Sequence, residues 1–282
     1  MNVSFCICVG PGYNQEYLNN IIFSIIDQPY VSDVSDDDYE IIICGDNVTL
    51  PGTLLNVCLP ITIIPFDDSQ SPRGWITRKK NLMVQAAKYD NIVLTHDYYL
   101  FDELWYTGLR KFDKENPDWK IMCNTVMTKE GTRSSDWLVN QRYMDEAIKA
   151  FPHFANELMS IAPGENGPRW VCGLPYDVKD LTHIQYVSGA YIVAKKDVLL
   201  ECPLNETLMW GDAEDIIWSQ DVVQHGFKFH FNPYCFVFIQ KPNKWHLHQM
   251  TDECVECLRE LFGPNEVILP EIIKLRNNNE SI

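Results

Sequence analysis

The sequence is poor in positive charge. Lys and Arg number 23 against 39 Asp and Glu, so the formal net charge at pH 7 is −16. A surface of that sign repels phosphate backbones and anionic headgroups, which argues against nucleic acid or an anionic membrane as a partner. An anionic substrate therefore needs a local positive feature here, such as a metal ion or a few placed cations.

Long apolar runs are also missing. No stretch approaches the roughly 18 residues that cross a bilayer, and residues 1–5 carry no basic segment of the kind that opens a signal peptide. We therefore expect no membrane span and a cytoplasmic protein.

The cysteines lack the spacing of a metal site. Several of the ten lie inside apolar runs, as Cys6 and Cys8 do, and such positions suit free, buried thiols in a reducing compartment. The one Cys-x-x-Cys, Cys254 to Cys257, has no second pair at zinc-finger spacing. We interpret these cysteines as structural or incidental.

What the sequence does contain is a regular alternation of short apolar runs and helical patterns. Apolar residues make up 46% of the chain, enough for a large core. The patterns predict strands near 3–9, 39–44, 61–64, 92–94 and 119–126, and helices over 14–26, 72–88 and 100–111. This alternation favours an α/β fold with a mainly parallel sheet and flanking helices. Ligands of such sheets bind beyond the carboxyl ends of the strands, where Gly10, Asp46 and Asp97 are expected.

The second half is less regular. Residues 129–180 are rich in Pro, Gly and aromatics, and we interpret them as an irregular insertion that carries recognition. Further on, the patterns predict a strand over 185–194, a helix ending near Gln224, and two short strands within 227–239. No internal repeat and no clear linker divides the chain.

Asp97 is the first candidate for chemistry. It follows the fourth predicted strand and is flanked by His96 and Tyr98. A carboxylate in that position can bind a hard divalent ion, which favours oxygen ligands and bridges to phosphates. The alternative is that Asp97 caps the next helix, which is the commoner role for an isolated Asp.

Two further groups carry charge. Asp212, Glu214 and Asp215 follow Trp210-Gly211 at the start of a predicted helix, where one carboxylate can serve as a general base. The alternative is that they only complement the helix dipole. The segment 78–81 holds three successive cations that can meet a diphosphate, or else form a solvated helix face.

His246 and His248 form the last candidate. Residues spaced i, i+2 point the same way on an extended chain, so either can ligate a metal. An unliganded surface pair is the commoner outcome for such histidines.

Taken in order, these motifs resemble the GT-A glycosyltransferases, closest to the family 2-like group, over residues 3 to 250. The matching features are the turn 10–14, Asp46 after the second strand, the basic segment 78–81, Asp97 in place of an Asp-x-Asp motif, the Ser-Gly turn within 187–190, the Trp-Gly-x-Glu-Asp-like box 210–215, and a downstream His. The chain departs from that pattern in three ways. Asp-x-Asp is reduced to His96-Asp97-Tyr98, Asp46 has no second Asp, and 129–180 matches no known segment.

The resemblance implies a single GT-A (Rossmann-like) domain with a smaller acceptor-side region. Residues 1–128 form the nucleotide-sugar half, 129–250 the acceptor-binding and catalytic half, and 251–282 a C-terminal helix and tail. It implies transfer of a sugar from a nucleoside diphosphate donor, UDP-linked in first place, to a glycan or other hydroxyl acceptor, with Mn²⁺ or Mg²⁺. The acidic box favours inversion, and retention, in which these carboxylates would bind hydroxyls, stays open.

The resemblance also implies roles for individual residues. The donor contacts are Gly10, Pro11, Asp46, Arg78, Lys79, Asn81, His96 and Asp97. The acceptor contacts are Gly189, Trp210 and Gly211, and the base is Asp215 or Glu214. The metal ligands are Asp97 with His246 or His248.

Two alternatives stay open. A sugar nucleotidyltransferase also combines a nucleotide-binding sheet with a metal carboxylate, but it needs a basic Gly-rich loop after the first strand, and residues 10–14 contain no cation. The reduced Asp-x-Asp motif raises the other alternative, a non-catalytic glycan-binding protein derived from a transferase.

Overall fold

The computed structural model describes residues 1–28, 39–50, 52, 59–71, 74–129, 133–134, 136–139, 159–164, 167–173 and 182–241. The elements of the first half are β1 (Val3–Cys8), α1 (Gln15–Ile26), β2 (Tyr39–Gly45), β3 (Ile61–Pro65), α3 (Ile76–Ala86), β4 (Asn91–His96), β5 (Tyr99–Phe101), α4 (Trp105–Glu115) and β6 (Ile121–Thr128). The second half holds β7 (Leu138–Val139), β8 (Met159–Gly164), β9 (Gly167–Gly173), β10 (Gln185–Tyr186), β11 (Tyr191–Lys195), α6 (Lys196–Glu201), α7 (Glu214–Gln224) and β12 (Phe229–Ile239).

The large sheet has the strand order β3-β2-β1-β4-β11-β6-β12-β5. Within the described residues, six of its strands run in one direction, and β11 and β5 run in the other. The edge at which β1, β2, β4 and β12 end is called the carboxyl rim below. Because β11 is antiparallel to β4, the turn that precedes β11 lies at this same rim.

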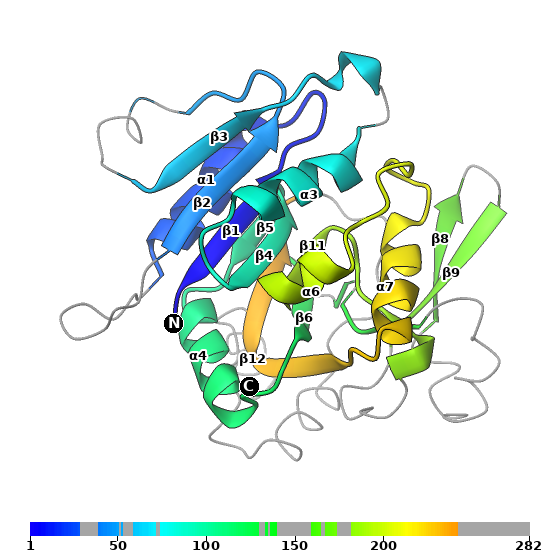
Figure 1. Ribbon diagram of the computed structural model, residues 1–282. Coiled ribbons are helices and arrows are strands. Elements are labelled where there is room, and N and C mark those ends of the chain that lie inside the picture. Colours follow the sequence, from blue (N-terminus) through cyan, green and yellow to red (C-terminus); the bar gives the residue numbers. More distant parts are fainter. Residues whose placement is uncertain are drawn as a thin grey trace, which may run out of the picture.

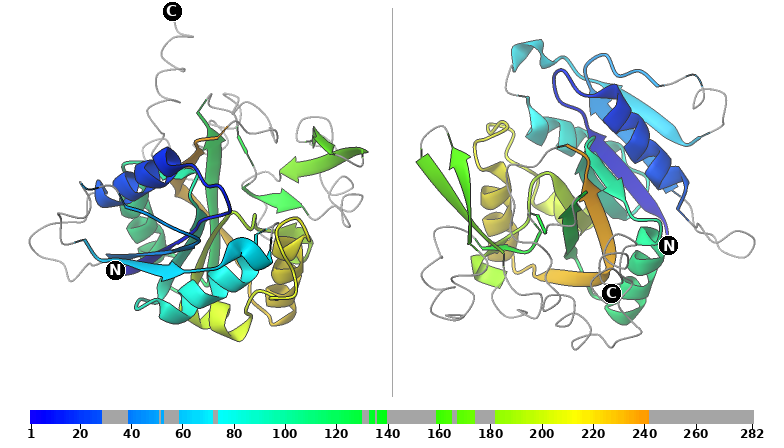
Figure 2. Two further views of the ribbon diagram at one scale, coloured as in Figure 1. Left: turned by 90° about the horizontal axis from the view of Figure 1, so that it is seen from above. Right: turned by 180° about the vertical axis from the view of Figure 1, so that it is seen from behind.

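Helices cover both faces of the large sheet (Figure 1). Apolar residues of α1 and α4 pack on one face, and those of α3, α6 and α7 pack on the other. The two layers are seen edge-on in the left view of Figure 2. Alternation along β1 explains the division, since Phe5 and Ile7 point to the first layer and Cys6 and Cys8 to the second. The predicted α/β architecture, a mainly parallel sheet with flanking helices, is confirmed.

The start of α1 follows directly from its sequence. Asn14 is the N-cap, and its Oδ1 accepts hydrogen bonds from the backbone N–H groups of Glu16 and Tyr17. These bonds satisfy donors that the first helical turn leaves free. Leu18, Ile21 and Ile22 then recur at helical spacing and are buried against the sheet.

A smaller sheet with the order β10-β7-β9-β8 lies beside α7 (Figure 1). Its strands β8 and β9 form an antiparallel hairpin. The prediction that residues 129–180 are irregular is thus wrong in part, because β7, β8 and β9 lie within this range and pair in a sheet. Sequence periodicity misses this because each strand is short and its partners are distant in the chain.

Three other predicted elements differ from the structure. The helix predicted from residue 100 begins only at Trp105, because Tyr99–Phe101 pairs with β12 as β5. The strand predicted over 185–194 is broken into β10 and β11, which belong to different sheets. The two strands predicted within 227–239 form one strand, β12, whose register shifts between Asn232 and Phe236. Pro233 lies in that interval, and its missing N–H explains why the ladder is interrupted there.

Two further predictions concern the cysteines and the absence of a membrane-spanning helix, and both can be compared with the described residues. Six cysteines among them, at positions 6, 8, 44, 123, 202 and 235, are free and buried, as expected. None of the helices in this part of the chain combines the length and the apolar character needed to cross a bilayer.

Candidate active site

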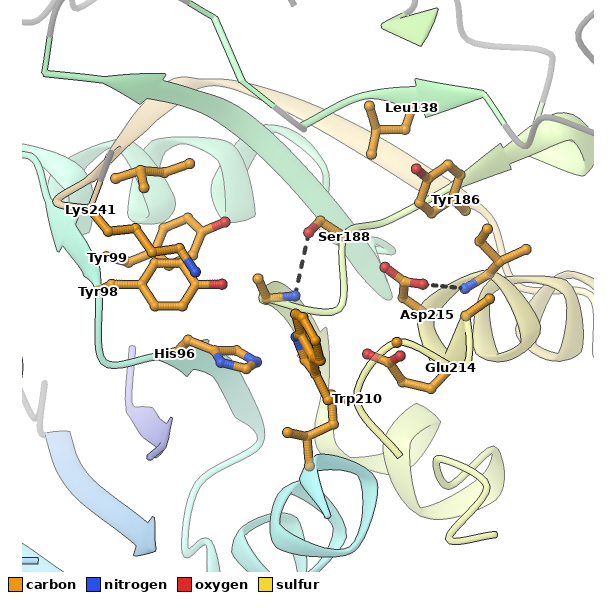
Figure 3. A pocket seen from close by; sticks show the side chains of 16 residues that line it. His96, Tyr98, Tyr99, Leu138, Tyr186, Ser188, Trp210, Glu214, Asp215 and Lys241 are labelled. Carbon is orange, nitrogen blue, oxygen red and sulfur yellow. Dashed lines mark hydrogen bonds between the residues drawn. The ribbon is translucent and has the colours of Figure 1, made fainter. Parts of the chain in front are cut away.

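A pocket of about 340 Å³ opens at the carboxyl rim. Its walls come from the β4–β5 turn, the turn before β11, the loop and first turn of α7, and the end of β12 (Figure 3). The polar and aromatic side chains that line it include His96, Tyr98, Tyr99, Tyr186, Ser188, Trp210, Glu214, Asp215 and Lys241. Segments distant in sequence therefore meet where the fold class predicts a ligand site.

Asp215 is held in one orientation at the start of α7. Its Oδ2 accepts a hydrogen bond of 2.9 Å from the backbone N–H of Gly189, and its Oδ1 accepts one of 2.9 Å from that of Ile216. Asp215 is half-buried and lines the pocket (Figure 3). The helix dipole also favours a negative charge in this turn. The result is a preorganised carboxylate that a bound molecule can reach.

Glu214 is more deeply placed than its neighbour. Its residue surface is only 7% exposed. Burial raises the pKa of the Glu214 carboxyl, Lys80 opposes that rise, and the charge of Asp215 adds to it. Ala213, just before it, adopts the left-handed conformation with φ of 57°, which is unusual for a residue other than glycine. The two adjacent carboxylates thus occupy different environments.

Lys80 connects α3 to Gly189, the residue that donates to Asp215. It lies on α3, is fully buried, and donates a hydrogen bond from Nζ to the carbonyl oxygen of Gly189. Gly189 therefore accepts from Lys80 on one side and donates to Asp215 on the other. Lys80 belonged to the basic segment 78–81 but was not among the predicted donor contacts. Its helical spacing from Ile76 and Met83, which are both buried, is the signal that identifies it as inward-facing.

Asp97 lies in the turn between β4 and β5, and it is 7% exposed. Burial raises the pKa of its carboxyl to about 6, although its own backbone N–H and the charge of Lys241 oppose the rise. The role of helix cap is not realised, since the N-cap of α4 is Leu104. The neighbours of Asp97, His96 and Tyr98, line the pocket, whereas Asp97 is not among its lining residues.

His96 is held neutral. Burial lowers the pKa of its imidazole well below the ordinary value, and the charges of Lys80, Lys241 and Lys79 lower it further. The backbone N–H of His96 donates to the carbonyl of Ala190 at 3.1 Å, which joins the end of β4 to the turn before β11.

Lys241, which follows β12, was missed by the sequence analysis. Its Nζ lies 3.3 Å from the centroid of the Tyr98 ring. Gln240 anchors this segment, because its Nε2 donates to the carbonyl of Tyr17 at 3.0 Å and its Oε1 accepts from Asn20 at 2.9 Å. The sequence contains one indication of its position. Lys241 is the first cation after the mainly apolar run Phe229–Ile239, which ends at the carboxyl rim.

Five of the predicted donor residues lie at the carboxyl rim, in two groups. Gly10, Pro11 and Asp46 follow β1 and β2 at the carboxyl rim, outside the pocket, with Pro11 and Asp46 exposed. His96 lies in the pocket wall, and Asp97 lies beside it. The acceptor candidates Trp210 and Gly211 line the same pocket, and Gly189 lies between two of its lining residues.

The three cations of the basic segment have different surroundings. The Nζ of Lys79 is buried and donates to Asp68 Oδ2 at 2.6 Å and to the carbonyl of Val9 at 2.8 Å. Arg78 is exposed, and its guanidinium lies 4.8 Å from the centroid of the Trp75 ring. Successive helix residues point about 100° apart, so the three cations cannot face one ligand. The charge of Lys80 acts on both pocket residues His96 and Glu214, whereas that of Lys79 acts on His96.

Asn81 is also engaged away from the pocket. Its Nδ2 donates to the carbonyl of Leu204 at 2.8 Å and to Glu206 Oε1 at 3.1 Å, and its Oδ1 accepts from the N–H of Leu204. Asn81 therefore supports the loop before α7, and its predicted donor contact stays a prediction.

A hard divalent ion beside Asp97 would need several oxygen ligands. Within the described part of the chain, one group of three potential ligands lies within 4.8 Å of one another, and it consists of Cys202, Asp221 and His225. That group lies at the carboxyl ends of α6 and α7, whereas Glu214 begins α7. No group of three such ligands includes Asp97 among the described residues. His246 and His248, its predicted partners, lie outside that part of the chain, so metal binding at Asp97 stays a prediction.

Known proteins resemble this chain in fold only. No family model and no curated protein matches it. The crystal structure of S. aureus TarS 1-349 in complex with UDP-GlcNAc matches with a TM-score of 0.53 and 12% identity, over 97% of this chain and 69% of that chain. TarS 1-349 alone matches with a TM-score of 0.48 and 13% identity, over 97% and 68%. The fold is therefore that of the GT-A-like glycosyltransferases, with its pocket at the carboxyl rim.

Proposed function

We propose that this protein is a glycosyltransferase that takes a sugar from a nucleoside diphosphate donor, UDP-linked in first place, and transfers it to a hydroxyl acceptor. The observation that carries the proposal is Asp215, a carboxylate fixed by two backbone N–H groups and open to a pocket at the carboxyl rim. Support comes from the fold shared with TarS, whose structure is described in complex with UDP-GlcNAc.

In this proposal Asp215 is the general base. It accepts the proton of the acceptor hydroxyl, and the hydroxyl oxygen bonds to the anomeric carbon of the donor sugar. The bond from that carbon to the diphosphate oxygen breaks, and the nucleoside diphosphate leaves with the electron pair, which inverts the anomeric configuration. Asp215 is preferred to Glu214 because it is half-buried, whereas Glu214 is buried beside the charge of Lys80. A base must come within hydrogen-bond reach of its proton.

Trp210 is proposed as the platform for a sugar ring. It is 61% exposed although it lines the pocket, and its backbone N–H donates to the carbonyl of Gly74 at 3.2 Å. Exposing so large an apolar surface costs free energy in water, which stacking on a sugar face recovers. Gly211 lies next to it at the pocket wall.

The nucleoside of the donor is assigned to the exposed stretch of the carboxyl rim formed by Gly10, Pro11 and Asp46, where Asp46 can accept hydrogen bonds from the base or ribose. Use of Mn²⁺ or Mg²⁺ stays a prediction of the sequence, because His246 and His248 lie outside the described residues. The proposed mechanism contains no metal step.

The proposal is tested by incubating the protein with UDP-GlcNAc, with Mn²⁺ and with EDTA, and measuring release of UDP. Wild type is expected to release UDP, and Asp215→Ala, which removes the proposed base, is expected to lose most of that activity. An Asp215→Ala variant with full activity contradicts the site. Release of pyrophosphate from nucleoside triphosphates identifies a nucleotidyltransferase instead. Binding of glycans without binding of UDP or UDP-GlcNAc identifies a non-catalytic protein.

A second prediction concerns Gly189. A Cβ at this position would lie 2.6 Å from Glu214 Oε1 and 3.0 Å from the Cβ of Asp215. Gly189→Ala is therefore expected to displace both carboxylates, lowering kcat by about 10- to 100-fold and the free energy of unfolding by about 1–3 kcal/mol. Steady-state kinetics and urea unfolding measure the two effects. Gly52→Ala is the matched control, since its Cβ meets nothing within 4 Å. Unchanged kcat in Gly189→Ala would refute the proposed position of Asp215.

A further inference from the structure

We infer that Lys241 is the cation that binds the diphosphate of the donor and stabilises it as it leaves. The inference rests on the proposed function and names a contact within that site. Lys241 follows the end of β12, next to the turn that carries His96, Asp97 and Tyr98.

The position of Lys241 follows from its neighbours in the chain. Its predecessor Gln240 is tied to α1 through Tyr17 and Asn20, and the backbone N–H of Gln240 donates to the carbonyl of Tyr98 at 2.8 Å. The segment is thus clamped between α1 and the β4–β5 turn. In Figure 3 the ammonium of Lys241 lies beside the ring of Tyr98, at the same side of the pocket as His96.

The other cations near the rim are engaged elsewhere. Lys79 is paired with Asp68, Lys80 is buried against the carbonyl of Gly189, and Arg78 lies over the ring of Trp75. Among the residues that line the pocket in the described part of the chain, Lys241 is the only Lys or Arg. In a protein with a net charge of −16, such a cation is the local positive feature that an anionic substrate needs.

The surroundings of Lys241 hold it ready for an anion. Lys241 is exposed at the pocket wall, with its Nζ 3.3 Å from the centroid of the Tyr98 ring. Asp97 is buried in the adjacent turn and is not among the residues that line the pocket. The ammonium of Lys241 is therefore open to an arriving diphosphate.

The chemistry of transfer needs a cation at this point. As the bond to the anomeric carbon breaks, negative charge grows on the departing diphosphate, and a fixed ammonium in a partly dry pocket stabilises that charge. A divalent ion fulfils this role in many sites, but the described residues around Asp97 do not form such a site. Lys241 is thus expected to affect both donor affinity and kcat.

The test is calorimetry with UDP and with uridine in EDTA, using wild type, Lys241→Met and Lys241→Arg. Wild type is expected to bind UDP more tightly than uridine without any metal. Lys241→Met is expected to lose about 10- to 100-fold in UDP affinity with no change for uridine, and Lys241→Arg is expected to restore most of the loss. Lys111→Met is the matched control, because Lys111 also lies over a tyrosine ring, that of Tyr234, but on α4.

Three results would overturn the inference. The first is a Lys241→Met variant that keeps the wild-type preference for UDP over uridine. The second is a Lys241→Met variant that binds UDP and uridine more weakly by the same factor. Either result denies a diphosphate contact. A preference for UDP that exists in wild type only with Mn²⁺ assigns the charge to a metal. Failure of the proposed function looks different, since wild type then binds neither UDP nor uridine.

Discussion

Asp215→Asn is expected to lower the kcat of sugar transfer by about 10²- to 10⁴-fold, the usual contribution of a general base. The amide keeps the size of the carboxylate but cannot accept the proton of the acceptor hydroxyl. The hydrogen bonds from Gly189 and Ile216 hold the present side chain in place, and an amide oxygen can keep one of them. Affinity for UDP is expected to stay within about twofold, because the diphosphate contact is assigned to Lys241.

The measurement is steady-state kinetics with a saturating acceptor, together with calorimetry for UDP. Asp221→Asn is the matched control, since Asp221 lies on the same helix, is half-exposed, and stands near its carboxyl end. Its kcat is expected to remain that of wild type. A loss of UDP affinity as large as the loss of kcat would mean that Asp215 supports the donor site and is not the base.

Asp97→Asn is expected to stabilise the fold. Burial raises the pKa of Asp97 to about 6 from the ordinary 3.8, so the folded state holds the proton more tightly than the unfolded state does. Stability therefore falls as pH rises from about 4 to about 6, and at neutral pH the ionised carboxylate costs about 3 kcal/mol. The neutral amide escapes this cost. A residue that destabilises the fold in this way is typical of functional sites.

Urea unfolding in EDTA measures this effect without interference from bound metal. At pH 7.5 the Asn variant is expected to exceed wild type by about 2–3 kcal/mol, and at pH 5 by about half as much. Asp46→Asn is the control, an exposed carboxylate on the same rim whose replacement is expected to change stability by less than about 0.5 kcal/mol at either pH. An advantage of Asp97→Asn that does not change with pH would show that the cost does not come from ionisation.

The position of Asp97 was predictable from sequence, but its surroundings were not. The apolar run before it marks a buried strand, and the rule that ligands gather beyond such strands indicates where the site lies. That Lys241 stands next to it depends on the pairing of β12 with β5, two segments that are distant in the chain. Local patterns carry no information on which strands pair.

The basic segment 78–81 illustrates the same limit at the level of a single helix. Its composition correctly indicated cations near the site, and the selection of Lys79 followed a resemblance in sequence order. The structure buries Lys79 against Asp68 and sends Lys80 towards the Gly189 turn. One position along a helix rotates a side chain by about 100°, so the neighbour of a predicted residue can face a different partner.

By itself the sequence determined the layered α/β architecture, the buried free thiols and the carboxyl rim, because these follow from local periodicity and from the general geometry of parallel strands. Only the tertiary structure decided which charges meet in the pocket. It separated half-buried Asp215 from buried Glu214, it engaged Lys79, Arg78 and Asn81 elsewhere, and it brought in Lys241. Burial and pairing between distant segments set the charge and reach of each group, and neither is encoded in the spacing of residues along the chain.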